Sequence, residues 1–223
     1  MTKLLIPALA IALLATAGCN WMNRAEAREA GPSVDRTYQV GAFDRIEAGG
    51  PYDVTVTSGG QPGVTARGGS NFLDETEVTV VDGVLRISPR KKNLRWSWSD
   101  DDSKVRMTVT TPALRGAAIA GSGNLSIDRV DAGKTEFSIA GSGEVRAAGK
   151  AQSIDVNIAG SGDVDLSGLE ATTAAISIAG SGNVRARATR TAAVSIMGSG
   201  DVEMTGGAKC SVSKNGSGNV RCN

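Results

Sequence analysis

The sequence predicts an all-β protein, a single-domain parallel β-helix or β-solenoid with coils of about 18–20 residues. The first observation is repetition: Gly-Ser-Gly occurs six times, at 121–123, 141–143, 160–162, 180–182, 198–200 and 216–218. The second is that apolar residues stand at every second position around each triplet, which is the period of a strand and not of a helix. The third is composition, because 29 Gly and only 4% aromatic residues suit thin, tightly turned β-structure better than a bulky core.

The apolar residues occupy the same columns in each repeat. Two residues before the triplet stand Ile119, Ile139, Ile158, Ile178, Ile196 and finally Lys214. Four residues after its first Gly stand Leu125, Val145, Val164, Val184, Val202 and Val220. One repeat is too small to bury its apolar face alone, whereas a stack in register buries a continuous column. We therefore expect a buried Ile column, with about nine coils at about 4.8 Å each and a body about 40 Å long.

Gly at both ends of the triplet permits the positive φ that a sharp corner requires. A phosphate-binding role is not indicated, since no Lys follows the triplet and no strand–loop–helix context surrounds it. The next column reads Asn124, Glu144, Asp163, Asn183, Asp201 and Asn219. Asn and Asp favour turns, and turn chemistry is the preferred interpretation. The alternative is a ladder of Ca²⁺ ligands, as in calcium β-rolls.

Residues 36–223 are assigned to the solenoid, with 116–223 as the regular coils and 36–115 as irregular N-terminal coils. The N-terminal part lacks the triplet but keeps strand alternation, for example at Tyr52, Val54 and Val56. The dipeptide Asp82-Gly83 separates two such runs and predicts a tight turn.

The first 18 residues predict a lipoprotein signal peptide, with Lys3 followed by a short apolar run. Thr16-Ala17-Gly18-Cys19 resembles a bacterial lipobox, so Cys19 is expected to carry a lipid that anchors the chain to a membrane. The alternative is ordinary signal-peptidase cleavage after Ala15-Thr16-Ala17. Residues 19–35 show no strand pattern and are interpreted as a flexible tether.

The cysteine count supports lipidation of Cys19, because three Cys would otherwise leave one unpaired in an oxidising compartment. Cys210 and Cys222 then form a pair on the inward parity of the last coil. We expect a disulfide with Cα atoms about 5–6 Å apart. The alternative, that the two thiols bind a metal, would be a poor site without His.

The chain contains no His, which excludes Ser-His-Asp and Cys-His catalysis and the common zinc sites. No catalytic residue, cofactor or metal site is predicted. With 24 basic and 23 acidic residues, the formal charge of +1 does not indicate nucleic-acid binding.

One outward column alternates in sign from its second member: Ser126, Arg146, Asp165, Arg185, Glu203 and Arg221. Stacking would place each charge between opposite charges, which favours one register. The alternative is chance alternation on a solvated surface.

Residues 90–104 form a charged segment that contains Trp96 and Trp98 beside Arg95. Exposed aromatic and basic side chains in this loop are possible contacts for a glycan, a lipid headgroup or a protein. The alternative is a hairpin tip whose Trp side chains fold back onto the solenoid.

Over about residues 40–222 the sequence resembles the bacterial auto-transporter adhesin head GIN domain family. The likeness rests on the segment from Phe43 to Val56, on Thr111-Pro112-Ala113-Leu114, and on the serial Gly-Ser-Gly-Asn/Asp-Val units. The resemblance implies a β-solenoid in secreted or surface-anchored proteins and brings no catalytic residues with it.

Two functions from different classes follow. The first is a non-catalytic, lipid-anchored module of the bacterial cell envelope, at the outer membrane and facing the periplasm or the cell surface, that binds surface polysaccharide or protein or serves as a spacer. The second is a carbohydrate-active β-helix enzyme that uses surface carboxylates.

Overall fold

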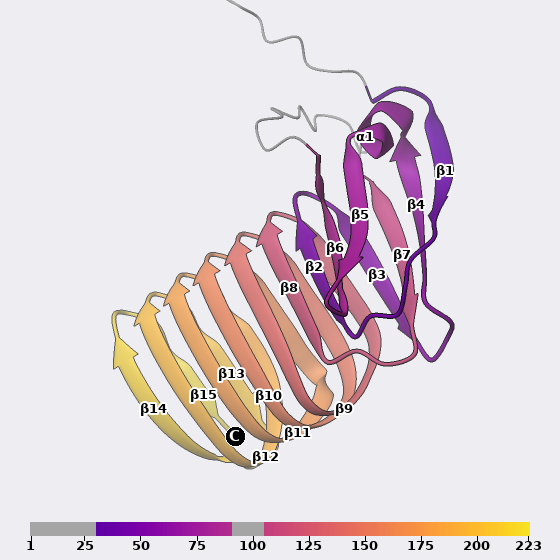
Figure 1. Cartoon of the computed structure of the whole chain (residues 1–223). Helices are drawn as coiled ribbons and strands as arrows, with labels where there is room; N and C mark the ends of the chain where they lie inside the picture. Colours follow the sequence, from indigo (N-terminus) through magenta and orange to yellow (C-terminus); the bar gives the residue numbers. More distant parts are fainter. Residues whose placement is uncertain (1–29, 91–104) are drawn as a thin grey trace, which may run out of the picture.

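The computed structural model describes residues 30–90 and 105–223. Fifteen strands form one continuous sheet, which winds into a solenoid at the C-terminal side and ends in a cap at the N-terminal side (Figure 1). The helix α1 (Ser70–Asp74) lies in the cap. Within the described ranges, no helix has the length and apolar character needed to cross a membrane. The predicted all-β solenoid is thereby confirmed.

The regular coils begin at β8 (Gly116–Gly121) and use long strands that bend midway between two triplets: β9 (Asn124–Gly141), β10 (Glu144–Gly160), β11 (Asp163–Gly180) and β12 (Val184–Gly198). Shorter strands β13 (Val202–Thr205), β14 (Lys209–Asn215) and β15 (Val220–Cys222) complete the stack. All these neighbours pair in parallel, and they are in register on both sides of each triplet, for example Ile158 with Ile139 and Val145 with Leu125. The register shifts only near the mid-strand bends of the long strands. Like therefore stacks on like, as the repeat phase predicts.

The core of the regular coils contains the predicted column of Ile side chains that stand two residues before each triplet. Ile119, Ile139, Ile158, Ile178 and Ile196 are each at most 3% exposed. The prediction of a buried, parallel Ile column is confirmed.

The triplets form corners that divide the regular coils into two faces. The strand segments before each triplet make one face, here called the pre-triplet face: β8, the C-terminal parts of β9–β12, and β14. The segments after each triplet make the other, called the post-triplet face: the N-terminal parts of β9–β12, β13 and β15. The backbone N–H of Ser161 and Ser181 donates to the first Gly carbonyl of the preceding triplet, at 2.8 Å in both cases, so the corners themselves stack.

Two more coils continue the stack, but not in chain order. The first is β2 (Arg45–Gly49) with β3 (Asp53–Ser58), and the second is β6 (Val84–Pro89) with β7 (Arg106–Thr111). Strand β2 lies between β6 and β8, and β3 lies between β7 and β9.

To reach β8, the chain after β7 must therefore cross the β2–β3 coil. Hydrogen bonds hold the crossing to the segment before β2: Thr111 Oγ1 donates to the Phe43 carbonyl at 2.9 Å, and Arg115 N donates to the Asp44 carbonyl at 2.7 Å.

The cap is antiparallel. Strand β4 (Gly63–Gly69) pairs with both β7 and β1 (Ser33–Tyr38), and extends the post-triplet face by two strands. Strand β5 (Thr76–Val81) forms a hairpin with β6 through Asp82-Gly83, both at positive φ, which confirms the predicted turn.

Two expectations need correction here. The regular solenoid makes about five turns, and with the β2–β3 and β6–β7 coils the stack is still shorter than the nine coils expected, because residues 33–38 and 63–81 go into the antiparallel strands and the helix of the cap. In addition, β1 begins at Ser33, so the last three residues assigned to the tether belong to the sheet.

Candidate functional site

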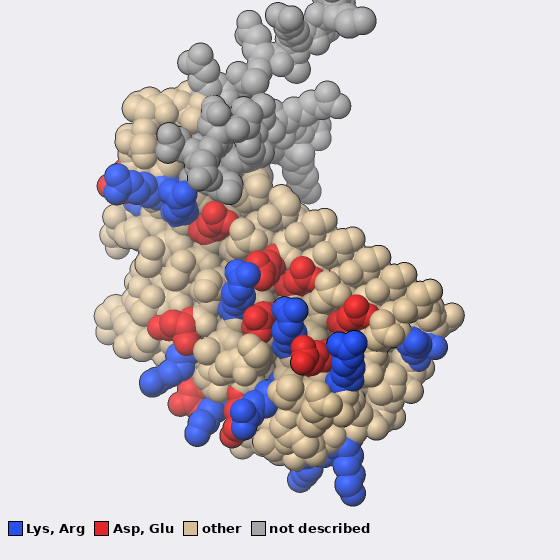
Figure 2. All heavy atoms as spheres, turned by 180° about the vertical axis from the view of Figure 1, so that it is seen from behind, with Lys and Arg blue, Asp and Glu red and all other residues tan. Residues whose placement is uncertain are grey.

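The post-triplet face is an extended polar surface. Seen from behind, basic and acidic side chains lie interleaved across it (Figure 2). Register places its outward side chains in two rows that run from strand to strand, from β1 in the cap to β15. Row one contains Asp35, Arg67, Arg106, Asp53, Asn124, Glu144, Asp163, Asn183, Asp201 and Asn219. Row two contains Thr37, Thr65, Thr108, Thr55, Ser126, Arg146, Asp165, Arg185, Glu203 and Arg221.

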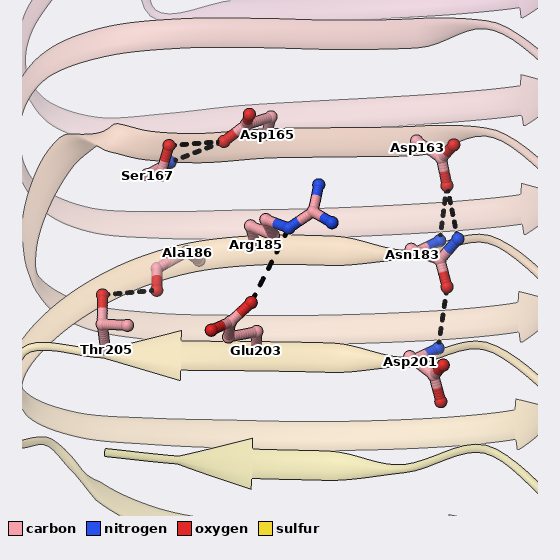
Figure 3. A network of polar contacts seen from close by, with 9 residues as sticks. All are labelled: Asp163, Asp165, Ser167, Asn183, Arg185, Ala186, Asp201, Glu203 and Thr205. Carbon is pink, nitrogen blue, oxygen red and sulfur yellow. Dashed lines mark hydrogen bonds and ion pairs between the residues drawn. The ribbon is translucent and has the colours of Figure 1, made fainter.

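The C-terminal half of row one is a hydrogen-bond ladder between coils (Figure 3). Asp163 Oδ1 accepts from both N and Nδ2 of Asn183, each at 2.9 Å. Asn183 Oδ1 in turn accepts from the N–H of Asp201 at 3.2 Å, and Asp201 Oδ1 accepts from the N–H of Asn219 at 2.7 Å. Each side chain thus satisfies a backbone N–H that follows the corner of the next coil.

The Asn and Asp residues from 163 to 219 are therefore explained by hydrogen bonds between coils and not by the unusual φ of a turn, since none of them has positive φ. Among residues 30–90 and 105–223, no group of three or more His, Cys, Asp or Glu side chains is placed to hold a metal ion.

Row two shows the predicted in-register stack of alternating charges, with Arg146 opposite Asp165, Asp165 opposite Arg185, and Arg185 opposite Glu203. One of these neighbours is in direct contact: Arg185 Nε lies 3.7 Å from Glu203 Oε2. Arg146 contacts Glu144 within its own strand instead.

Asp165 is held within its own strand by Ser167. Its Oδ1 accepts from the Ser167 hydroxyl at 2.6 Å and from the Ser167 N–H at 3.0 Å (Figure 3). The pKa of Asp165 is lowered, and the main cause is the hydrogen bond from the Ser167 hydroxyl. Desolvation opposes this shift, whereas the Ser167 N–H and the positive charges of Arg185 and Arg146 add to it. The carboxylate is therefore held ionised, which suits a structural acceptor and not a general acid.

Two open hollows are lined by charged side chains, one within the two rows and one at the mid-strand bend of β9. One, of about 300 Å³, lies at the C-terminal end of the post-triplet face and is lined by Asn183, Arg185, Asp201, Glu203, Asn219 and Arg221. The other, of about 480 Å³, is lined by Arg45, Arg115, Asp131, Lys134 and Glu136. The first places two carboxylates beside two Arg, as a carbohydrate-active site would. However, Asp201 accepts a backbone N–H and Glu203 pairs with Arg185, so both contribute contacts between coils.

The pre-triplet face differs in kind, because from β8 onward the outward residues of the two rows nearest the corner are uncharged and, apart from Met197, small. The two rows nearest the corner are Ala118, Ser138, Asn157, Ser177, Ser195 and Ser213, and Ala120, Ala140, Ala159, Ala179, Met197 and Asn215. Met197 is 66% exposed and is the one large apolar side chain in these rows.

The last coil is closed by a disulfide between Cys210 and Cys222, whose Cα atoms lie 6.6 Å apart. The predicted pairing is confirmed, with a separation slightly above the expected range. Lys214 occupies the Ile column in this coil, and its Nζ donates to the Gly218 carbonyl at 2.7 Å. Val212, whose counterparts in earlier coils are buried, is 48% exposed.

Three predicted contact residues, Arg95, Trp96 and Trp98, lie outside the described residues, as does the predicted lipidation site Cys19. In the sequence the Trp segment lies between β6 and β7. The N-terminal halves of both rows were not predicted from the sequence. The Thr-x-Thr segments at 55–57 and 108–110 were visible, but their alignment depends on the pairing of β3 with β7.

Comparison with known proteins agrees with this architecture. A putative adhesin from Bacteroides fragilis has a similar structure, with a TM-score of 0.67 and 23% identity over 86% of this chain and 97% of that one. A putative lipid binding protein from Parabacteroides distasonis gives a TM-score of 0.54 and 21% identity, again over 86% and 97%. At these identities the similarity shows the fold alone. No curated protein matches the chain.

The family described as Putative auto-transporter adhesin, head GIN domain, matches residues 42–223. This range contains the β2–β3 coil, all six triplets and the terminal disulfide. The chain therefore belongs to the auto-transporter adhesin head GIN domain family.

Proposed function

We propose that this chain is an exported, lipid-anchored module of the bacterial cell envelope that binds surface polymers or proteins and catalyses no reaction. The observation that carries the proposal is the post-triplet face, a polar sheet surface continuous from β1 to β15. Its C-terminal carboxylates are engaged in contacts between or within coils, while many of its outward side chains stay accessible. Family membership and the lipobox-like Thr16-Ala17-Gly18-Cys19 support an adhesin-like role at the envelope.

Anchoring is tested by expressing the full chain and a Cys19→Ser variant in bacteria supplied with an alkyne-tagged fatty acid. We expect label on the wild-type chain alone, and release of the variant from the membrane fraction. Equal labelling of both chains, or none of either, would reject lipidation at Cys19 and support ordinary cleavage after Ala17.

Binding without catalysis is tested by incubating the purified chain with intact cells and with isolated envelope polysaccharide. We expect retention on cells with no release of new reducing ends. Release of reducing ends that is lost in Asp201→Asn or Glu203→Gln would instead establish the carbohydrate-active enzyme.

A further inference from the structure

The N-terminal half of row one contains a pair of like basic charges, whereas the other like-charge neighbours of this row, Glu144 and Asp163, are both acidic. In the antiparallel pair β4–β7, Arg67 lies directly opposite Arg106, and both side chains point outward and are exposed. Like charges directly opposite each other across a strand pair destabilise the sheet. In the regular coils, by contrast, row two alternates in sign from Arg146 to Arg221.

The acidic neighbours of this pair leave much of the two guanidinium groups available. Arg67 is approached through its Nε, which lies 3.8 Å from Asp35 Oδ1, and both side chains are more than two-thirds exposed. Asp53 stands opposite Arg106 on the other side, but its Oδ1 accepts from Asn124 Nδ2 at 2.7 Å. Among the described residues, Arg106 has no ion pair within 4.0 Å.

An unbroken row of hydroxyls lies beside the Arg pair. Thr65 and Thr108 lie two residues from Arg67 and Arg106 on the same strands, and they are directly opposite each other. The strand register continues this row to Thr37 on β1, Thr55 on β3 and Ser126 on β9. All five are exposed. Adjacent strands are about 4.8 Å apart, so the row offers hydroxyl donors and acceptors at regular intervals along one line.

We propose that Arg67, Arg106, Thr65 and Thr108 form a subsite for an acidic polysaccharide. Guanidinium groups bind carboxylate and sulfate oxygens through paired charge-assisted hydrogen bonds, so an oxyanion between the two Arg relieves their repulsion. The hydroxyl row matches the hydroxyl groups of the sugar rings on either side of that anion. The inference rests on the proposed binding function and specifies its ligand class. The shared chemistry is an oxyanion on a polyhydroxylated chain, whether a uronate or a sulfate ester.

The test is calorimetric titration of the full chain with polygalacturonate, dextran sulfate and neutral dextran at low salt. We expect binding of one or both anionic polymers and none of neutral dextran. Arg67→Gln/Arg106→Gln should lose affinity at least tenfold, and Thr65→Val/Thr108→Val should weaken binding less. The matched control is Arg146→Gln/Arg221→Gln, which removes the same charge from the same face and should retain wild-type affinity.

A second readout separates binding from a structural role. Because the Arg pair is repulsive, the Arg67→Gln/Arg106→Gln variant should unfold at the same or a higher temperature than the wild type while losing affinity. Equal losses in the control variant would show non-specific charge attraction and overturn the subsite. So would unchanged affinity in the Arg67→Gln/Arg106→Gln variant. If the wild type binds none of the polymers but is retained on cells, the subsite is rejected and the proposed function stands.

Discussion

The two Gly of each triplet serve different purposes in the corner. The first has positive φ in all six triplets, for example +140° at Gly180, and a Cβ there would overlap the carbonyl oxygen of Gly160 in the preceding coil. That carbonyl accepts the N–H of Ser181 at 2.8 Å, so it has little freedom to move. The third residue, Gly182, lacks positive φ, but a Cβ would overlap the Gly162 carbonyl. The first position therefore requires Gly because of its positive φ, and both positions require Gly because a side chain would clash with the preceding coil.

Gly180→Ala is therefore expected to lower the free energy of unfolding by about 2–4 kcal/mol, because it combines an unfavourable φ with a clash against backbone. Urea denaturation measures the effect. The control is Gly133→Ala, at a position where a Cβ meets only a side-chain oxygen at 4.0 Å, and this change should alter stability by less than about 0.5 kcal/mol. Equal effects at the two positions would contradict the corner constraint.

Asp165 predicts a defined pH dependence. Its folded-state pKa is lowered, first by the Ser167 hydroxyl, so the ionised form stabilises the fold above the ordinary value of about 3.9 and the contribution is lost as pH falls through the folded pKa. The difference in unfolding free energy between wild type and Asp165→Asn should be constant from about pH 5 to 7 and should shrink below about pH 4. Urea unfolding of both proteins across pH 3–7 measures this. A difference that persists unchanged at pH 3 would show that the carboxylate charge is not responsible.

At the scale of strands, the alternating charges of row two select the pairing register more than they stabilise it by direct contacts. Arg146, Asp165, Arg185 and Glu203 occupy successive rungs, yet of these rungs Arg185–Glu203 is the one in direct contact. Exposed pairs contribute only about 0–1 kcal/mol each. A slip by one coil would place Arg beside Arg, so the column disfavours the wrong pairing even where the right pairing adds little.

Asp165→Arg places three Arg on successive rungs of β10, β11 and β12. Relative to Asp165→Asn, which also perturbs the hydrogen bonds from Ser167, we expect a further loss of about 1 kcal/mol at low salt. This further loss should be largely recovered at about 1 M salt, where the Debye length falls to about 3 Å. The matched control is Glu77→Arg, an exposed charge reversal opposite Ser88 on the β5–β6 hairpin, which should be nearly neutral and insensitive to salt. If the two reversals respond alike, the column has no registry role.

At the scale of the whole molecule, the two ends of the stack differ. The N-terminal end is covered by the antiparallel cap, whereas β14 pairs only with β12, and β15 only with β13, among the described strands. The last coil is held instead by the Cys210–Cys222 disulfide, which closes a loop of 12 residues. Replacing both Cys by Ser should cost about 3 kcal/mol by the chain-entropy estimate. Hydrogen exchange should show the loss of protection confined to β14 and β15. Protection lost throughout the stack would mean that the last coil does not open locally.

The open end also carries a charge where the other coils carry Ile. Lys214 stands at the Ile196 position, and Val212 beside it is 48% exposed. An inward charge on an edge strand discourages pairing with another chain. Lys214→Ile should therefore produce end-to-end dimers in sedimentation velocity, while Lys209→Ile, an exposed change on the same strand, should leave the chain monomeric. A monomeric Lys214→Ile variant would show that other features protect this edge.

The sequence by itself determined the regular half of this protein. Six repeats in the same phase specify parallel stacking, the buried Ile column, the outward charge column and the facing of Cys210 and Cys222, because each follows from superposing one coil on the next. The N-terminal half has the same alternation of apolar and polar residues. Because this alternation is the same in parallel and antiparallel strands, it does not show which of the two pairings the strands adopt. Only the tertiary structure decided that β6–β7 stacks outside β2–β3, that β1, β4 and β5 run antiparallel, and that Arg67 faces Arg106. These pairings join segments far apart in the chain, and no repeat fixes their register, so burial in the assembled cap selects them.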